Sequence, residues 1–460
     1  MKNWFGIFCV STLVLSLGAC NLGNGSSAAP PPWDSVTGGA TAGDGRVRLR
    51  WTPTPGVDYW LFMASDASLT AFNWISLPNS HAYINAPSPY YVCGLYNGTT
   101  YYFATNGRID GGPGGTSSSS VYGTPYNAAI RTNGWQPGTI PSGIYGLGYT
   151  SLTTCGNNSA ISSGGIFAAV GVNGAIYTSE DGKFNWTDHH INNLTANLNA
   201  VTGYAANQNN TTNPSLRWIA VGDGGTVVYF DGTNWLEGNA FGSTANSNTQ
   251  ALRAITHVAS VYTAVGDAGT ILSTTDGITW TSHTASSGTT NNLRGVTHGL
   301  IYVAVGDGGT IITSVDGNTW TPRTPTTPVT ANLRQVTSFV SIYGTIYVAV
   351  GDAGTVVISK DGGTTWDTTT PPSTSSAALV GVTVESQFSY VATPVADPLL
   401  GFVTTAQFVA IDSNGNAYTS VNGYEWSAAV PVGITSVNAL VSSGFGYVAA
   451  GNNGATAYAF

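Results

Sequence analysis

Three arginines occur at one position of a repeated phrase, L-R-x-[IV]-T. They are Arg253, Arg294 and Arg334. Each phrase is followed by an apolar run and a G-D-x-G turn, and these turns contain Asp267, Asp307 and Asp352. A guanidinium can hold a carboxylate through two parallel N–H groups, so the arginines could bind a carboxylate or an acidic peptide of a partner. They could also form structural Arg–Asp pairs that connect neighbouring repeats. Both interpretations remain open at the level of sequence.

A second set of acidic residues lies in another glycine turn, shortly before a tryptophan. Its members are Asp181, Asp231, Asp276, Asp316 and Asp361, with Asn422 in the same place of one further repeat. Glycoside hydrolysis would need two carboxylates that converge on one sugar bond. Similar positions spread around one fold cannot all be active sites, whereas an aspartate in a tight turn readily accepts backbone N–H groups. We interpret this set as structural and expect no catalytic residue in it.

These residues are carried by a repeat of short apolar strands that occupies the region 126–460. The stretch YVAVGDGGTIITSVDGNTW, which ends at Trp320, contains two strands, two glycine turns and a tryptophan. The first turn occurs in seven copies, spaced by roughly 47 residues, and a further strand precedes most copies. Four strands per repeat predict an all-β propeller, whose sheets bury their faces against one another.

The last repeat is incomplete, since the chain reaches Phe460 after three strands. The segment 131–140 has a turn and Trp135 but no strands of its own before it. We predict a seven-bladed propeller closed by this N-terminal strand, which would also remove exposed sheet edges. One repeat carries an apolar insertion, residues 387–407, which would either extend a blade or form a docking patch.

Two resemblances support this architecture. TSVDGNTW resembles the Asp-box, or BNR, repeat of sialidases and other propellers. The longer unit LRGVTHGLIYVAVGDGGTIITSVDGNTW resembles the repeat of the photosystem II stability and assembly factor family. The second resemblance implies a seven-bladed propeller that binds a partner protein, has no enzymatic activity and uses the arginine positions as contacts. The Asp-box resemblance keeps a sialidase-like glycosidase as the enzymatic alternative, although true sialidase arginines come from unlike positions.

Residues 33–125 form a separate unit of short alternating strands with aromatic residues. Trp51 ends one strand, and the spacing of Leu95, Gly98 and Tyr101 resembles the tyrosine-corner region of fibronectin type III domains. This resemblance predicts a β-sandwich in front of the propeller. The aromatic residues are expected to form its core.

The N-terminus has the pattern of an export signal. Residues 1–19 combine Lys2 with an apolar run that is too short to span a bilayer comfortably. The end of this run, Leu-Gly-Ala-Cys, resembles the lipobox of bacterial lipoproteins, which implies lipidation of Cys20. Asn21 then favours the outer membrane, on either its periplasmic or its surface face. Residues 20–32 are expected to be the lipidated cysteine and a flexible linker. The alternative to the lipoprotein signal is an ordinary secretory signal with a chance cysteine.

The composition and the number of cysteines limit which partners, cofactors and disulfides can be expected. The formal net charge is −9 and the charged residues make up 8% of the chain, so no basic stripe is present and nucleic acid is not an expected partner. Cys93 and Cys155 could form a disulfide between the two units or remain separate thiols. No cofactor is expected, and no metal site, because zinc would need three or four converging ligands.

Together these patterns predict a non-enzymatic lipoprotein of the cell envelope whose propeller binds a protein or a glycan. Two alternatives remain, and they belong to other functional classes. One is a glycoside hydrolase, which a convergent pair of carboxylates would favour. The other is a structural subunit of a surface filament or adhesin, for which the low charge is permissive.

Overall fold

The structure is a computed structural model of the 460-residue chain. It describes residues 25–35, 38–43, 46–86, 88, 90–93, 95–96, 98–125, 135–150, 166–179, 182–183, 186–205, 216–231, 234–239, 250–341, 344–369, 377–390, 402–443, 446–452 and 454–459. The predictions for the signal peptide, Cys20, Asp181 and the partner cysteine Cys155 lie outside these ranges. Within them the chain is all-β, as predicted, with short 3-10 turns and no α-helix. The same ranges hold no helix with the length and apolar character needed to cross a bilayer.

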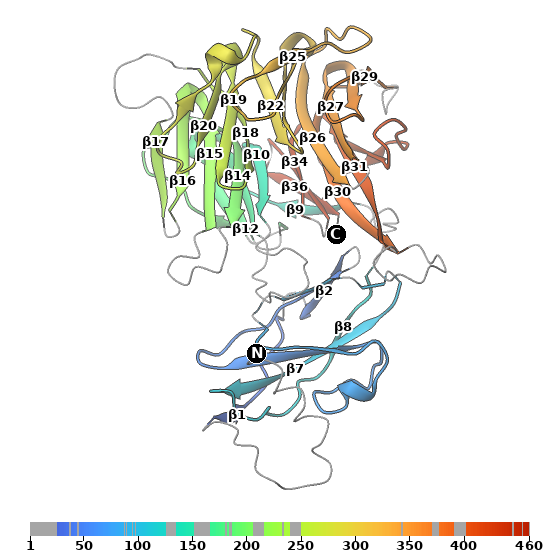
Figure 1. The fold of residues 1–460 in the computed structure, drawn as a ribbon. Helices are drawn as coiled ribbons and strands as arrows, with labels where there is room; N and C mark the ends of the chain where they lie inside the picture. Colours follow the sequence, from blue (N-terminus) through green and yellow to red (C-terminus); the bar gives the residue numbers. More distant parts are fainter. Residues whose placement is uncertain are drawn as a thin grey trace.

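The N-terminal unit is a sandwich of two antiparallel sheets (Figure 1, blue). The smaller sheet has the order β2 (Ala40–Gly43), β3 (Arg46–Leu49) and β6 (Tyr90–Cys93). The larger sheet has the order β1 (Ser26–Ala28), β7 (Tyr101–Ile109), β4 (Asp58–Ala64) and β5 (His81–Tyr83), and β8 (Val121–Gly123) also pairs with β7. A 3-10 turn, η1 (Trp74–Ser76), lies between β4 and β5.

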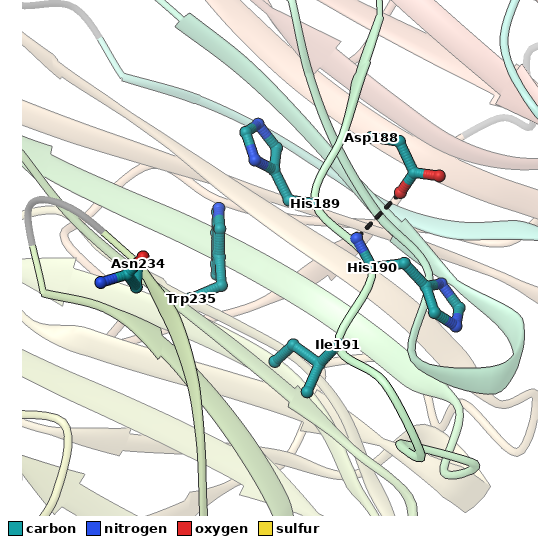
Figure 2. Close-up of a pocket in the computed structure, with 6 residues that line it drawn as sticks. All are labelled: Asp188, His189, His190, Ile191, Asn234 and Trp235. Atoms are coloured by element: carbon teal, nitrogen blue, oxygen red, sulfur yellow. Dashed lines mark hydrogen bonds between the residues drawn. The ribbon is translucent and has the colours of Figure 1, made fainter.

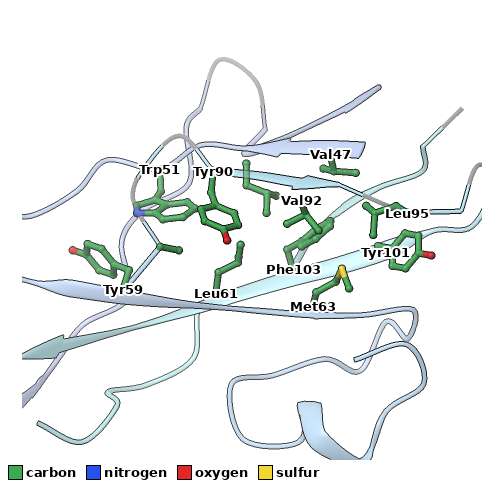
Figure 3. Packing of buried hydrophobic residues seen from close by; sticks show 12 residues of the cluster. Val47, Trp51, Tyr59, Leu61, Met63, Tyr90, Val92, Leu95, Tyr101 and Phe103 are labelled. Atoms are coloured by element: carbon green, nitrogen blue, oxygen red, sulfur yellow. The ribbon is translucent and has the colours of Figure 1, made fainter. Parts of the chain in front are cut away.

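Aromatic and aliphatic side chains from both sheets fill the space between them (Figure 3). Trp51 is 2% exposed and packs edge-on against Tyr59, with ring centroids 6.3 Å apart. The hydroxyl of Tyr101 accepts the backbone N–H of Tyr96 at 3.1 Å, which ties the start of β7 to the preceding loop. The expected core role of these aromatic residues is therefore observed.

The sandwich begins earlier than the sequence predicted. Ser26–Ala28, expected within the flexible linker, form β1 and pair with the end of β7. Glycines and other small residues permit this close contact, because a Cβ atom on Gly115 would lie 1.8 Å from the carbonyl oxygen of Ala28. The pairing depends on main-chain hydrogen bonds of an edge strand, which leave no apolar pattern for sequence analysis to detect.

The described part of the C-terminal unit contains seven four-stranded antiparallel sheets, which we call propeller sheets 1 to 7 in chain order. Sheet 1 consists of β10 (Ile144–Thr150), β11 (Ile166–Gly171), β12 (Ile176–Ser179) and β13 (Thr187–Asp188). Sheet 2 consists of β14 (Leu198–Ala205), β15 (Leu216–Gly222), β16 (Thr226–Phe230) and β17 (Trp235–Asn239). Sheet 3 consists of β18 (Leu252–Val258), β19 (Val261–Gly266), β20 (Ile271–Thr274) and β21 (Thr281–Ser282).

The remaining sheets repeat this meander. Sheet 4 consists of β22 (Leu293–His298), β23 (Tyr302–Gly306), β24 (Ile311–Ser314) and β25 (Thr321–Arg323). Sheet 5 consists of β26 (Leu333–Ser341), β27 (Gly344–Gly351), β28 (Val356–Ser359) and β29 (Asp367–Thr368). Sheet 6 consists of β30 (Leu379–Tyr390), β31 (Phe402–Asp412), β32 (Asn416–Ser420) and β33 (Val430–Pro431). Sheet 7 consists of β34 (Val437–Ser442), β35 (Tyr447–Gly451), β36 (Ala455–Ala459) and β9 (Gln136–Thr139).

The first strands of consecutive sheets pack against one another, and β34 packs against β10, so the contacts close on themselves. This is the arrangement of a β-propeller, as predicted. The last sheet is completed by the predicted N-terminal segment. In it β9 pairs with β36, with Thr139 opposite Ala455 and Gln136 opposite Tyr458. In Figure 1 this strand runs beside the C-terminal strand. Trp135 packs against Tyr447 of the same sheet, with ring centroids 6.5 Å apart.

Each propeller sheet buries both faces against its neighbours. One cluster, for example, joins Val303 and Val305 of sheet 4 to Val336 and Tyr347 of sheet 5. The Tyr347 hydroxyl donates to the carbonyl oxygen of Ile301 at 3.0 Å, which adds a polar link between the same two sheets. Because no sheet can bury its apolar faces alone, the repeats depend on one another for stability.

The apolar insertion at 387–407 extends a sheet. β30 and β31 pair far beyond the length of their counterparts, as far as Tyr390 opposite Phe402. Of the two alternatives for this insertion, strand extension is the one that the described residues show.

Candidate functional site

One residue in the first strand of every propeller sheet lies on a β-bulge. In sheet 4, Leu293 is opposite Gly306 and Gly295 is opposite Val305, so the intervening Arg294 has no partner residue. The same irregularity recurs in all seven described sheets, at Tyr145, Asn199, Arg253, Arg294, Arg334, Val380 and Asn438. A bulge interrupts the alternation of a strand and redirects the extra side chain. It therefore turns the arginines toward the adjacent glycine turn.

The glycine turn between the second and third strands is a short 3-10 turn that begins at the aspartate. The turns with aspartate are η4 (Asp223–Gly225), η5 (Asp267–Gly269), η7 (Asp307–Gly309) and η8 (Asp352–Gly354). The first glycine is required by packing, because a Cβ atom on Gly266 would lie 2.1 Å from the carbonyl oxygen of Ala251. The same carbonyl accepts the N–H of Asp267 at 2.9 Å. The turn is thus fixed against the start of the first strand, where the bulge lies.

Each arginine forms an ion pair with the aspartate of its own sheet. Arg253 donates Nε and Nη2 to the two carboxylate oxygens of Asp267, at 2.9 and 2.8 Å. Arg294 binds Asp307 in the same way, with Nη2 at 3.1 Å from Oδ2. The third pair joins Arg334 and Asp352 through Nε. The pairing therefore lies mainly within a sheet, which differs from the expected links between neighbouring repeats. Arg253 also approaches the preceding sheet, with Nη1 4.0 Å from Asp223.

The pairs are partly solvent-accessible and electrostatically coupled. The arginine side chains are between 33% and 41% exposed. The hydrogen bond to Asp267 raises the pKa of Arg253, and the hydrogen bond from Arg294 lowers the pKa of Asp307. Arg334 of the next sheet lowers the pKa of Asp307 further. The charges of adjacent sheets are thus close enough to influence one another.

Asparagines link the sheets at this face. Asn292 accepts the N–H of Ala268 in the preceding sheet at 3.0 Å and donates to Asp307 of its own sheet at 3.0 Å. Asn332 repeats both contacts one sheet further along, with Gly308 and Asp352. Sequence analysis missed this role, although the asparagine of the N-L-R phrase is visible in two repeats. It is the asparagine, rather than the arginine, that mainly connects neighbouring sheets.

The residue on the bulge and the residue at the start of the glycine turn change together from sheet to sheet. Sheets 3, 4 and 5 have arginine and aspartate, whereas sheet 6 has Val380 and Ser413 and sheet 7 has Asn438 and Asn452. In sheet 2, Asn199 donates both to Asp223 and to the carbonyl oxygen of Leu252 in sheet 3. The charges are therefore confined to one sector, which we call the charged arc: Arg253, Arg294, Arg334, Asp223, Asp267, Asp307 and Asp352. Three arginines against four aspartates give this arc a formal charge of −1.

In the second turn of the repeat, the acidic side chain accepts backbone N–H groups of the same turn. Oδ1 of Asp276 accepts the N–H groups of Ile278 and Thr279 at 2.8 and 2.7 Å. Asp316, Asp361 and Asn422 make equivalent contacts in their own turns. Burial alone would raise the pKa of Asp276, but these N–H groups and a threonine hydroxyl outweigh it and lower the pKa to about 2. In sheet 2, Oδ1 of Asp231 accepts the N–H of Asn234 at 2.8 Å.

His189 and His283 form equivalent hydrogen bonds in two different sheets and do not converge on one site. His189 bonds the hydroxyl of Thr178 at 2.7 Å, and His283 bonds Ser273 at 2.8 Å in the matching place of sheet 3. Burial lowers the pKa of both rings, which favours the neutral form. Among the residues that the structure describes, no three His, Cys, Asp or Glu side chains gather in a way that could hold a metal ion.

No family model and no curated protein matches the chain. Similar solved structures include one described as YCF48 bound to D1 peptide, at 17% identity and a TM-score of 0.49, over 72% of this chain and 96% of that one. YCF48 from Cyanidioschyzon merolae is 15% identical with a TM-score of 0.46, over 71% and 98% of the two chains. The computationally designed Ika8 protein is 12% identical with a TM-score of 0.43, over 70% and 97%. The class of the protein, a β-sandwich followed by a β-propeller, rests on the strand pairing described above.

Proposed function

We propose that the protein is a non-enzymatic, exported lipoprotein whose seven-bladed propeller binds a partner protein at the charged arc. In this proposal each propeller sheet is one blade, and the second turns are Asp-boxes. The sandwich is a fibronectin type III-like spacer. Its sheet order and the Tyr101 hydrogen bond support that assignment. The lipobox pattern at Cys20 supports anchoring to the cell envelope and the outer membrane.

The observation that carries the proposal is the anchoring of each guanidinium by its own aspartate. In the pairs of Arg253 and Arg294, Nε and one Nη2 proton face the carboxylate. An arginine has five N–H donors in a fixed fork, so the Nη1 protons of Arg294 point away from Asp307 and can reach another acceptor. Nη1 of Arg253 already lies 4.0 Å from Asp223. An anchored guanidinium loses little conformational entropy when a partner carboxylate binds.

The charge balance defines the kind of partner. A strongly acidic protein surface would be repelled by the four aspartates as much as it is attracted by the arginines. A segment with a single carboxylate beside amide or hydroxyl groups fits better, because it can use the guanidinium edges without opposing the aspartates. The charged arc runs over the consecutive sheets 2 to 5, which gives such a segment one direction in which to lie.

The experiment compares co-purification of envelope proteins with the wild-type chain and with an Arg253→Ala, Arg294→Ala, Arg334→Ala variant. Loss of a specific partner from the variant is expected. The matched control is Arg323→Ala, which removes an arginine of β25 that bonds Thr313 and lies outside the arc. An unchanged set of partners in the triple variant, at normal thermal stability, would leave the arginines as structural pairs only.

A further inference from the structure

A polar groove lies between propeller sheets 1 and 2, on their outermost strands and therefore away from the charged arc on the first strands. It has a volume of about 500 Å³ and is lined by Asp188, His189, His190, Ile191, Asn234 and Trp235 (Figure 2). One wall is the end of β13 and the segment after it, and the other wall is the beginning of β17. Neither the repeat architecture nor the proposed partner site requires this groove.

Trp235 differs from the tryptophans of sheets 4 and 5, whereas Trp280 of the adjacent sheet 3 is half-buried as Trp235 is. Trp320 and Trp366 are 4% and 0% exposed, and each indole N–H donates to a glycine carbonyl of its own turn. Those turns have a serine two residues before the aspartate, such as Ser314, whose hydroxyl accepts the N–H of Gly317 at 2.8 Å. Sheet 2 has Tyr229 in that place.

The altered turn moves the tryptophan into a strand. Trp235 is the first residue of β17 and pairs with Phe230 of β16. Its ring lies 5.5 Å from that of Phe230 and 6.3 Å from the imidazole of His189. The side chain is only half-buried and forms a wall of the groove. The hydrogen bond between the His189 ring and the Thr178 hydroxyl fixes the neighbouring imidazole.

Polar side chains line the same groove as this aromatic ring, with Asn234 beside it and with Asp188 and His190 on the far side of the segment 188–191 (Figure 2). Asp188, His190 and Asn234 are exposed and line the same groove. Oδ1 of Asp188 accepts the N–H of His190 at 2.8 Å, which orients the carboxylate. Carboxylate and amide groups at fixed angles can each bond two neighbouring hydroxyls of a ligand. Ile191 is the one aliphatic residue of the lining.

We propose that this groove binds a saccharide. The apolar C–H face of a sugar ring can stack on the Trp235 indole while its hydroxyls bond Asn234, and a following sugar unit of the same chain can reach Asp188 and His190. The described residues of the lining include a carboxylate and no lysine or arginine, which disfavours phosphorylated or other anionic ligands. They also form no aliphatic pocket for the side-chain anchors on which peptide binding depends.

The test screens the full chain, purified in detergent, on an array of neutral oligosaccharides that includes glucans and chitin fragments. The best ligand is then measured by isothermal titration calorimetry. Trp235→Ala is expected to weaken binding by about ten-fold or more, since stacking and its desolvation are lost together. Asn234→Ala, which keeps the backbone turn, is expected to weaken it by a smaller factor and serves if the tryptophan variant does not fold.

Two controls make the result specific. Leu236→Ala changes an exposed residue of the same strand, and it should leave saccharide binding unchanged. The triple arginine variant should also keep saccharide binding, which separates this site from the charged arc. Absence of any saccharide ligand on the array would overturn the proposal, as would equal affinity of wild type, Trp235→Ala and Asn234→Ala.

Discussion

The link between sheets 3 and 4 through Asn292 gives the most direct test of how the propeller is held together. Asn292→Ala removes the acceptor for the Ala268 N–H and the donor to Asp307, both at 3.0 Å. The first bond is exposed, so water replaces it and the loss is about 0.5 kcal/mol. The second is partly buried and involves a carboxylate, which makes its loss about 1.5 kcal/mol. We therefore expect the free energy of unfolding to fall by about 2 kcal/mol.

The assay is urea unfolding followed by far-ultraviolet circular dichroism, with comparison of midpoints because the chain has two units. The matched control is Asn192→Ala, which changes an exposed asparagine of an inter-sheet segment. Sheet 3 supplies the reverse experiment, since Ala251 stands where sheet 4 has Asn292. Ala251→Asn places an amide near Gly224 and Asp267, and it should raise the midpoint if the link is general. Equal midpoints for Asn292→Ala and Asn192→Ala would refute the reasoning.

Two further predictions concern the turns. Ala268 has a left-handed φ of 54°, where sheets 2 and 4 use glycine, so Ala268→Gly should stabilise the propeller by about 0.5–1 kcal/mol; a lower urea midpoint would contradict this. Asp276→Asn should destabilise less than Asp276→Ala at pH 7, because Asn422 makes the same contacts in its own turn and only the contribution of the charge is lost, whereas Asp276→Ala loses these contacts as well and should cost about 1 kcal/mol or more. The pKa of Asp276 is lowered from 3.8 to about 2, so its charge-dependent contribution is present above pH 4 and is lost as the pH falls toward 2. Urea midpoints at both pH values check this, and an asparagine variant as unstable as the alanine variant at pH 7 would refute it.

The candidate site was predictable in its members but only partly in its contacts. The spacing of L-R-x-[IV]-T and G-D-x-G placed the arginines and aspartates near one another, because both occur at the same end of adjacent strands. The choice of partner depended on the bulge. A bulge changes which way one side chain points, and no residue in the phrase signals it as glycine or proline signals a turn. The link through Asn292 was missed for the same reason.

The sequence by itself determined the all-β class, the propeller repeat, the role of Asp276 and its counterparts, and the segment that pairs with the last strand. These follow from strand periodicity and turn chemistry, which act over a few residues and repeat along the chain. Tertiary structure alone decided that the Arg–Asp pairs lie within sheets, that Ser26–Ala28 join the sandwich, and that Trp235 lines a groove. These features depend on register and on contacts between elements distant in sequence, where exposed main-chain groups and half-buried side chains leave no periodic pattern.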